Sequence, residues 1–286
     1  MTIAEPGRTV GGAAIDPIGL WEEIEVMTVA PGTLAFWWLY QAGLILKSTA
    51  GTTIAIDPYL SDAANRSYNQ ARNVPAPLEP GMTRLDAVLA THSHEDHLDP
   101  DSVVGFAQHD VTRFIGPPLV CAAVQGHGVD PARTVAIGRG DVVNVRDLEI
   151  RAVCARHPFA PEPVPDAVGY LVTGDGVSIY HSGDTEYDAE IVRDVQQPTA
   201  AFIAINGTAG NMNADEAALL AWRLGAHRAI PFHYGLWKDS GYGEGATIDP
   251  RRFVDTYRRL DPNGQTLVLD PAKTYILNRD GTIAQP

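Results

Sequence analysis

The sequence predicts an α/β fold in which two sheets pack together and helices cover their outer faces. Three observations predict it. Short apolar runs bounded by Gly, Pro, Asn or Asp recur along the chain, as is typical of strands. Segments with helical spacing separate several of these runs, and no segment has the composition of a linker. Interleaved helices and strands favour helices layered on sheets. We therefore expect one domain over residues 15–286, preceded by a flexible tail over residues 1–14, which is rich in Gly, Pro and small residues.

The first predicted elements are a helix over 15–27 and three closely spaced strands. Turn residues at 40–43 and 49–51 separate the strands, so we expect an antiparallel start to a sheet. A polar and then proline-rich connection over 61–82 follows and is expected to face a substrate. The three strands are expected over 33–39, 44–48 and 52–57.

The later elements alternate between the two types. The helix at 214–224 is predicted by Asn213 and Glu216, which form a capping-box pattern, and by Gly225 at its end. Other helices are expected over 101–108, 119–126 and 250–260. Strands are expected over 86–91, 114–118, 141–145, 148–154, 168–173, 177–181, 202–205, 229–232 and 266–269.

The composition limits the class of partner. The chain has 35 Asp and Glu against 21 Lys and Arg, a formal charge of −14, which repels nucleic-acid phosphates. Its 2 cysteines are too few for a disulfide framework. The first residues lack the pattern of an export signal, and no apolar run is long enough to cross a bilayer. We expect a cytoplasmic protein with a small-molecule substrate and no nucleic-acid or membrane partner.

The segment Thr-His-Ser-His-Glu-Asp-His, residues 91–97, is the densest chemical signal in the chain. It follows the predicted strand over 86–91. His92 and His94 can point to one side of an extended backbone, and the next turn brings Asp96 and His97 from another direction. Imidazole and carboxylate ligands suit zinc, manganese or iron. The segment therefore predicts a metal site, with room for two ions.

Three further candidate ligands follow predicted strands. His157 comes after the strand over 148–154, Asp184 after the strand over 177–181, and His233 after the strand over 229–232. Strand ends in an α/β sheet gather at one edge, so residues that are far apart in the sequence can meet there.

These motifs together resemble the metallo-β-lactamase-fold hydrolases, from about residue 33 onward. The resemblance is carried by the pattern His-x-His-x-Asp-His followed by His157, Asp184 and His233 in that order. The stretches 29–39, 46–48, 181–184 and 230–233 are similar to the L-ascorbate-6-phosphate lactonases. The resemblance implies an αββα sandwich of two mixed sheets flanked by helices. His157 and the shorter segment before the histidine cluster depart from the lactonase pattern, which leaves the substrate open.

The resemblance also implies roles for the residues of the site. It assigns His92, His94 and His157 to one metal ion. It assigns Asp96, His97 and His233 to a second ion, with Asp184 bridging the two. Asp57 is expected to orient a ligand histidine through its other ring nitrogen. His181 lies just upstream of the bridging aspartate. The expected catalytic residues are Asp96, Asp184 and His181.

The expected activity is hydrolysis with two divalent ions, zinc or manganese, with iron as an alternative. A metal-bridging hydroxide would open a lactone or similar ester of a small polar metabolite, with or without a phosphate. Candidate substrate contacts are Arg66, Tyr68, Arg72, Lys238 and Tyr242. The candidate leaving-group acids are Lys238, Tyr242 and His181. The main alternative is a phosphodiesterase acting on a small cyclic or linear phosphodiester. A di-iron oxidoreductase is less favoured because such proteins carry Glu where His94 stands, and a non-catalytic binding protein is less favoured because the ligand set is complete. The resemblance further implies a homo-oligomer.

Overall fold

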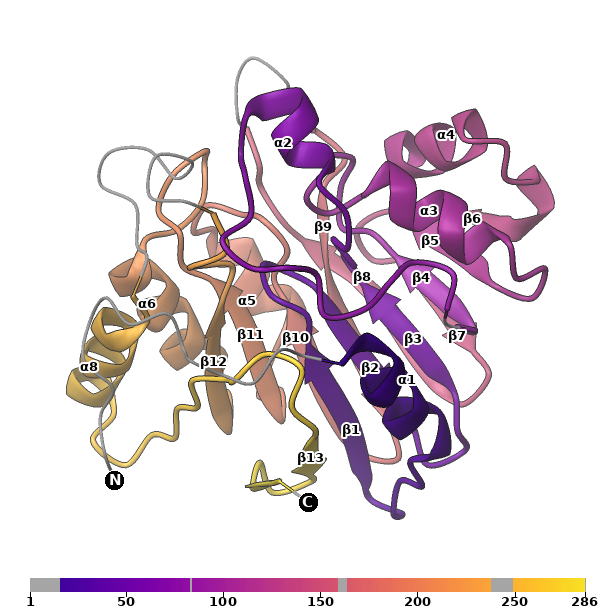
Figure 1. Cartoon of the computed structure of the whole chain (residues 1–286). Helices are drawn as coiled ribbons and strands as arrows, with labels where there is room; N and C mark the ends of the chain where they lie inside the picture. Colours follow the sequence, from indigo (N-terminus) through magenta and orange to yellow (C-terminus); the bar gives the residue numbers. More distant parts are fainter. Residues whose placement is uncertain (1–15, 83, 159–163, 238–248, 286) are drawn as a thin grey trace.

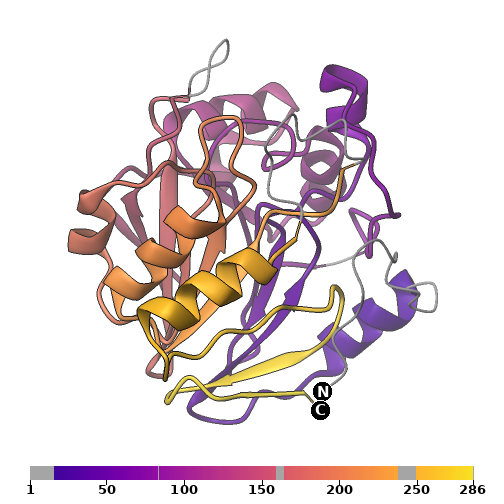
Figure 2. The ribbon, with the colours of Figure 1, turned by 90° about the vertical axis from the view of Figure 1, so that its left-hand side faces the viewer.

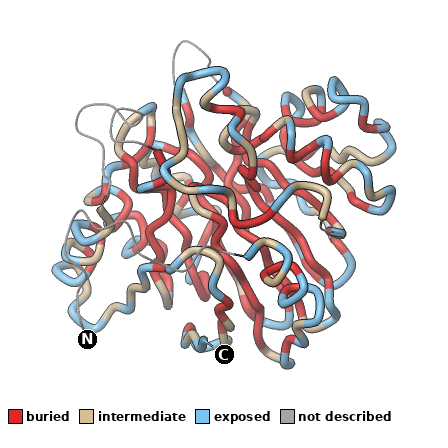
Figure 3. Tube along the Cα trace, viewed as in Figure 1, coloured by how far each residue is buried: buried red, intermediate tan, exposed pale blue. Residues whose placement is uncertain are grey.

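The computed structural model describes residues 16–82, 84–158, 164–237 and 249–285. Two sheets lie face to face, and helices cover their outer sides (Figures 1 and 2), as predicted. The residues buried most completely follow the strands through the middle of the molecule, while the exposed residues lie on the helices and loops (Figure 3). The expected tail over residues 1–14 falls outside the described residues.

The first sheet has eight strands within the described residues. They are β1 (Thr33–Trp38), β2 (Leu44–Lys47), β3 (Thr53–Ile56), β4 (Ala87–Leu89), β5 (Arg113–Gly116), β6 (Thr134–Ala136), β13 (Tyr275–Asn278) and β14 (Ile283–Ala284). Their spatial order is β14-β13-β1-β2-β3-β4-β5-β6. The pairs from β1 to β3 are antiparallel, as predicted, and the pairs from β3 to β6 are parallel.

The second sheet has six strands in the same part of the chain. They are β7 (Val142–Val145), β8 (Leu148–Cys154), β9 (Val168–Gly174), β10 (Val177–His181), β11 (Ala200–Ala204) and β12 (Arg228–Phe232). Their order is β12-β11-β10-β9-β8-β7. β10, β11 and β12 are parallel, and β8 runs in the same direction because it is antiparallel to β9. The carboxyl ends of β8, β10 and β12 therefore meet at one edge.

The helices complete the outer layers. They are α1 (Pro17–Val26), α2 (Ala63–Tyr68), α3 (Pro100–Ala107), α4 (Pro118–Gly126), α5 (Ala189–Asp194), α6 (Ala214–Leu224) and α8 (Arg251–Leu260), with a 3-10 turn at Pro131–Arg133. α1, α3 and α4 share an apolar cluster with the outer face of the first sheet, and α6 packs on β11 and β12. α6 and α8 lie side by side on the second sheet (Figure 2). Among the described helices, none combines the length and apolar character needed to cross a membrane.

Alternation along β1 explains how the two apolar layers form. Phe36 and Trp38 belong to the core between the sheets, whereas Trp37 belongs to the cluster under α1. The ring of Phe36 meets Phe202 of β11 edge-on, with 5.3 Å between the ring centroids. The adjacent Trp37 and Trp38 are thus both buried, on opposite faces of one strand.

The strand expected over 266–269 is wrong. Thr266 forms only an isolated bridge with Ala229, and the chain then turns away to form β13 beside β1 and β14 at the edge. The run Thr-Leu-Val-Leu favours strand locally, but it makes no continuous ladder with β12. The connection over 61–82 contains the helix α2, which was not predicted. It is held to the segment after His233 by the bond from the Asn73 backbone N–H to the Leu236 carbonyl, 2.8 Å long.

Candidate metal centre

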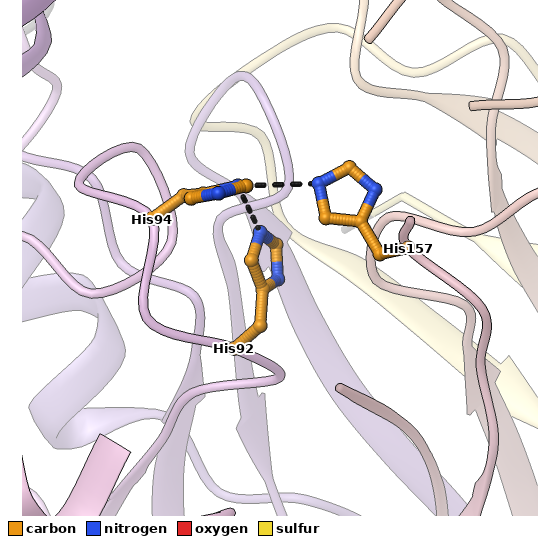
Figure 4. A group of neighbouring side chains, drawn as sticks. All are labelled: His92, His94 and His157. Atoms are coloured by element: carbon orange, nitrogen blue, oxygen red, sulfur yellow. Dashed lines mark hydrogen bonds between the residues drawn. The ribbon is translucent and has the colours of Figure 1, made fainter. Parts of the chain in front are cut away.

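Three histidines meet where β4 and β8 end. His92 and His94 lie in the turn after β4, and His157 follows β8. The Nε2 atoms of His92 and His157 each lie 3.1 Å from Nδ1 of His94. Figure 4 shows the three rings pointing toward one another. Their nitrogens thus face a common point, as the ligands of one ion would.

A second group forms beside the first. Nε2 of His97 lies 3.2 Å from Nε2 of His233, which follows β12 directly. The Asp96 Oδ2 atom is 3.7 Å from Nε2 of His97 and 3.5 Å from Nε2 of His233. The turn after β4 therefore supplies ligand atoms to both groups.

Asp184 stands between the two groups. Its Oδ1 atom lies 3.3 Å from Nε2 of His97 and 3.0 Å from Nε2 of His233. Its Oδ2 atom lies 3.8 Å from Nε2 of His157. One carboxylate thus presents a different oxygen to each group, which is the position that a bridging ligand needs.

The chemistry of the residues present fits divalent metal. Nδ1 of His97 lies 2.8 Å from Oδ2 of Asp57, which places one imidazole proton on Nδ1 and turns Nε2 toward the centre. Within the described residues, the buried Oδ1 atom of Asp184 makes no hydrogen bond of good geometry. Buried acceptor atoms that face one another without a cation or a donor are costly. Imidazole nitrogens and carboxylate oxygens are the donors that zinc and manganese accept.

Burial and charge set the protonation states. Burial lowers the pKa of His92 well below its usual value and lowers that of His157 to about 4, so both are neutral and able to bind metal. Burial alone would raise the pKa of Asp184, but the neighbouring His233 and His97 hold that pKa well below its usual value. His97 is different: burial opposes its charge, yet the carboxylates of Asp184, Asp96 and Asp57 raise its pKa well above the usual value.

Asp57 holds the turn that carries the ligands. Its Oδ1 atom accepts a hydrogen bond of 2.7 Å from the Thr91 backbone N–H, and its Oδ2 atom accepts one of 2.8 Å from the Thr91 hydroxyl. The same Oδ2 atom faces His97. Asp57 has a φ of 48° and His233 has a φ of 61°, a backbone region that side chains other than Gly rarely adopt. Such strain at two strand ends is typical of a functional site.

The structure gives His181 surroundings that do not suit the expected catalytic role. The residue is buried, and its Nε2 atom donates to the Ala42 carbonyl at 2.8 Å. Its Nδ1 atom accepts from the Gly183 N–H at 3.2 Å. Because the backbone occupies both ring nitrogens, the ring fixes β10 against the turn between β1 and β2. This geometry leaves no ring nitrogen for proton transfer to a substrate.

The candidate substrate residues are placed in several ways. Arg66 is exposed on α2 and pairs with Asp101 of α3 at 2.8 Å. Tyr68 is exposed at the end of the same helix. Arg72 donates to the carbonyls of Tyr59 and Val74, and these contacts hold the connection rather than reach the metal centre. Lys238 and Tyr242 lie outside the described residues.

One polar contact with a candidate ligand, and two buried amides in a loop joined to the segment after Asp184, were not predicted. Gln41 donates from Nε2 to Asp96 Oδ2 at 3.0 Å. Asn206 and Asn211 are buried in the loop after β11, which is bonded to the segment after Asp184 through the Met212 N–H and the Thr185 carbonyl. No sequence signal distinguishes these amides from other loop residues, since Asn and Gln are common in turns.

The comparisons agree with this architecture. The beta-lactamase superfamily domain matches residues 52–234. A relative named as the probable L-ascorbate-6-phosphate lactonase UlaG of Escherichia coli O139:H28 is 32% identical over 267 residues, covering 77% of this chain and 75% of that protein. Igni18, a metallo hydrolase from Ignicoccus hospitalis, is similar with a TM-score of 0.65 and 21% identity, covering 86% of this chain and 99% of that one. CmlA, a diiron beta-hydroxylase from Streptomyces venezuelae, is similar with a TM-score of 0.63 and 16% identity, covering 87% of this chain and 54% of that one.

The chain combines two sheets between helices with His and Asp side chains that gather at strand ends and could hold metal. The chain belongs to the beta-lactamase superfamily and has the metallo-β-lactamase fold, as predicted. The predicted similarity to the ascorbate-phosphate lactonases is also confirmed, and so is the prediction of a metal-dependent hydrolase.

Proposed function

We propose that this chain is a two-metal hydrolase that opens a lactone, or a similar ester, of a small polar metabolite. The observation that carries the proposal is the position of Asp184, whose two oxygens face two separate groups of ligand atoms. The lactonase name of the relative at 32% identity supports the substrate class.

The residues of the centre divide into holding and orienting roles. His92, His94 and His157 would hold one ion, and Asp96, His97 and His233 the other, with Asp184 shared. Asp57 keeps the proton of His97 on Nδ1, so that Nε2 faces the centre. Bound there, a metal pair supplies Lewis acidity, which lowers the pKa of a water and polarises the oxygen that gains charge. Arg66, Tyr68, Lys238 and Tyr242 stay candidates for substrate contact.

Replacing Asp184 tests the proposal. Asp184→Ala is expected to lose metal content and to lose turnover by about 100-fold or more, because both groups lose a shared ligand and a buried negative charge. The measurements are elemental analysis of purified protein and a hydrolase screen over sugar lactones and phosphodiesters. The matched control is Asp110→Ala, because Asp110 is exposed. Full metal content and activity in a folded Asp184→Ala protein would exclude the two-metal assignment.

The same screen decides between the proposed substrate class and the main alternative. Turnover of small phosphodiesters without turnover of lactones would replace the lactonase proposal with a phosphodiesterase, while the metal centre would stand. We also propose a homo-oligomer, which light scattering of the purified protein measures. The cytoplasmic location stays a prediction.

A further inference from the structure

The turn between β1 and β2 reaches the metal centre although none of the candidate metal ligands comes from it. Gln41 lies in this turn and is completely buried. Its Nε2 atom donates a hydrogen bond of 3.0 Å to Oδ2 of Asp96. This oxygen is the one that faces Nε2 of His233, at 3.5 Å. The amide of Gln41 therefore contacts the same carboxylate oxygen that the second ligand group uses.

The backbone of the same turn holds two more residues of the site. The carbonyl of Gln41 accepts from the His233 N–H at 3.0 Å and from Nε1 of Trp38 at 2.9 Å. The carbonyl of the next residue, Ala42, accepts from Nε2 of His181. The position of Asp96 and the backbone of His233 thus depend on one residue of a tight turn.

The turn is strained, and these contacts keep it so. Tyr40 has a φ of 70° and Gln41 has a φ of 47°, a region that hairpin turns usually fill with Gly, Asn or Asp. Such a conformation is unfavourable for a residue other than Gly, and it persists only where the surrounding structure holds it. Tyr and Gln both disfavour a positive φ, so the formation of the turn does not explain why Gln stands at position 41.

We infer that Gln41 is a positioning residue for the half of the metal centre formed by Asp96 and His233. The inference rests on the proposed two-metal function. The neutral amide of Gln41 donates a hydrogen bond that fixes the orientation of the Asp96 carboxylate. An Arg or Lys in its place would also neutralise the negative charge of Asp96, whereas the amide leaves that charge available to a metal ion. Residues that hold ligands in this way set metal affinity, and replacing them typically costs about 10–100-fold. Replacing Gln41 should therefore weaken the binding of one ion, the one held by Asp96 and His233.

Two variants separate the side chain from the fold. Gln41→Met keeps the side-chain length and the backbone contacts of Gln41, but its side chain has no N–H group to donate to Asp96. Gln41→Asn accepts positive φ more readily than Gln, so the turn should fold at least as well, while the shorter amide should not reach Asp96. Gln197→Met is the matched control, because Gln197 is exposed and has the same φ of 47°.

Stepwise calorimetric titration of the metal-free proteins with Zn²⁺ or Mn²⁺ measures the two affinities directly. Wild type and Gln197→Met should bind two ions. Gln41→Met and Gln41→Asn should bind one ion with unchanged affinity and the other about 10–100-fold more weakly. Circular dichroism and a thermal melt of the metal-free proteins identify a variant that does not fold, and the other variant then decides. Wild-type affinity for both ions in a folded Gln41 variant would overturn the inference.

The failure of the inference differs from the failure of the proposed function. If the wild type and the Gln41 variants all bind two ions with equal affinities, only the role of Gln41 is overturned. A wild-type protein that binds a single ion would overturn the two-metal proposal as well.

Discussion

Asp57 connects the strand framework to one ligand. Its carboxylate accepts hydrogen bonds from the backbone and hydroxyl of Thr91 and faces Nδ1 of His97, and all of these atoms are buried. A single carboxylate therefore sets both the shape of the turn after β4 and the tautomer of a ligand histidine.

Replacing Asp57 by Asn tests this arrangement. Asp57→Asn keeps the shape but has one acceptor oxygen for three donors, so it should destabilise the metal-free protein by about 1–3 kcal/mol. The affinity for the ion at His97 should fall by about 10–100-fold. Urea denaturation of the metal-free protein and calorimetric metal titration measure the two effects. Unchanged metal affinity would show that His97 needs no carboxylate to orient it.

Protonation of His97 predicts a pH dependence. Neighbouring carboxylates raise the pKa of His97 well above its usual value in the metal-free protein, so the ring carries a proton that a metal ion must displace. Because the folded pKa lies above the unfolded one, this proton stabilises the metal-free fold below the unfolded pKa, and the stabilisation is lost as pH rises through the folded pKa. Metal affinity should accordingly rise with pH, with proton release on binding.

Titration calorimetry in buffers of different ionisation enthalpy measures that proton release. Asp57→Asn, which removes one of the charges that raise the pKa of His97, should release fewer protons at the same pH. Metal binding to wild type without proton release below the raised pKa would contradict the prediction.

At the scale of elements, α5 holds the end of β8, the strand that precedes His157. Asp194, at the end of α5, accepts a hydrogen bond of 2.8 Å from the Cys154 N–H at the end of β8, and it pairs with Arg139. The hydrogen bond from Arg139 lowers the pKa of Asp194. The carboxylate thus connects the helix to the last residue of β8.

Asp194→Asn should destabilise the fold by about 1 kcal/mol at neutral pH, since the ion pair is partly solvated. Because the folded pKa of Asp194 is depressed, its contribution is present above the unfolded pKa and is lost as pH falls through the folded pKa. Thermal melts of wild type and variant across pH should therefore differ at pH 7 and converge in acid. A constant difference across pH would indicate that the cost comes from packing rather than charge.

The elements that could be predicted from the sequence are those with a long or well-marked local pattern. β1 to β3 have clear turns between them, and α6 has its capping box, which the structure contains. α2 and α5 were missed because six residues are too few to show a helical period. β13 was missed because its pairing with β1 depends on where the chain turns after α8, a tertiary effect that local propensity does not contain.

Among the residues of the site, those with a local sequence pattern could also be predicted, and those placed by tertiary contacts could not. The structure brings the predicted metal ligands together, since few side chains bind metals and their spacing after strands is informative. Gln41 could not be predicted, because a glutamine in a turn has no specific chemical signature. Its contact with Asp96 arises only when the first hairpin meets the end of β4.

At the scale of the whole molecule, the centre joins the two sheets. The ligands come from the ends of β4 in one sheet and of β8, β10 and β12 in the other. Bound ions would therefore hold the two halves of the sandwich together at one edge, whereas without them the carboxylates of Asp96 and Asp184 face the rings of His97 and His233.

Metal removal should consequently lower global stability. An ion present at 100 times its dissociation constant stabilises the folded state by about 2.7 kcal/mol. For a domain of this size, each kcal/mol shifts the midpoint of thermal unfolding by about 2–4 °C, so chelation should lower it by about 5–10 °C. Differential scanning calorimetry before and after chelation, with metal added back as the reversal, measures this. Asp184→Ala, which lacks the ligand between the two groups, should show a smaller shift under the same conditions. An equal shift in both proteins would mean that the stabilising ions bind elsewhere on this acidic chain.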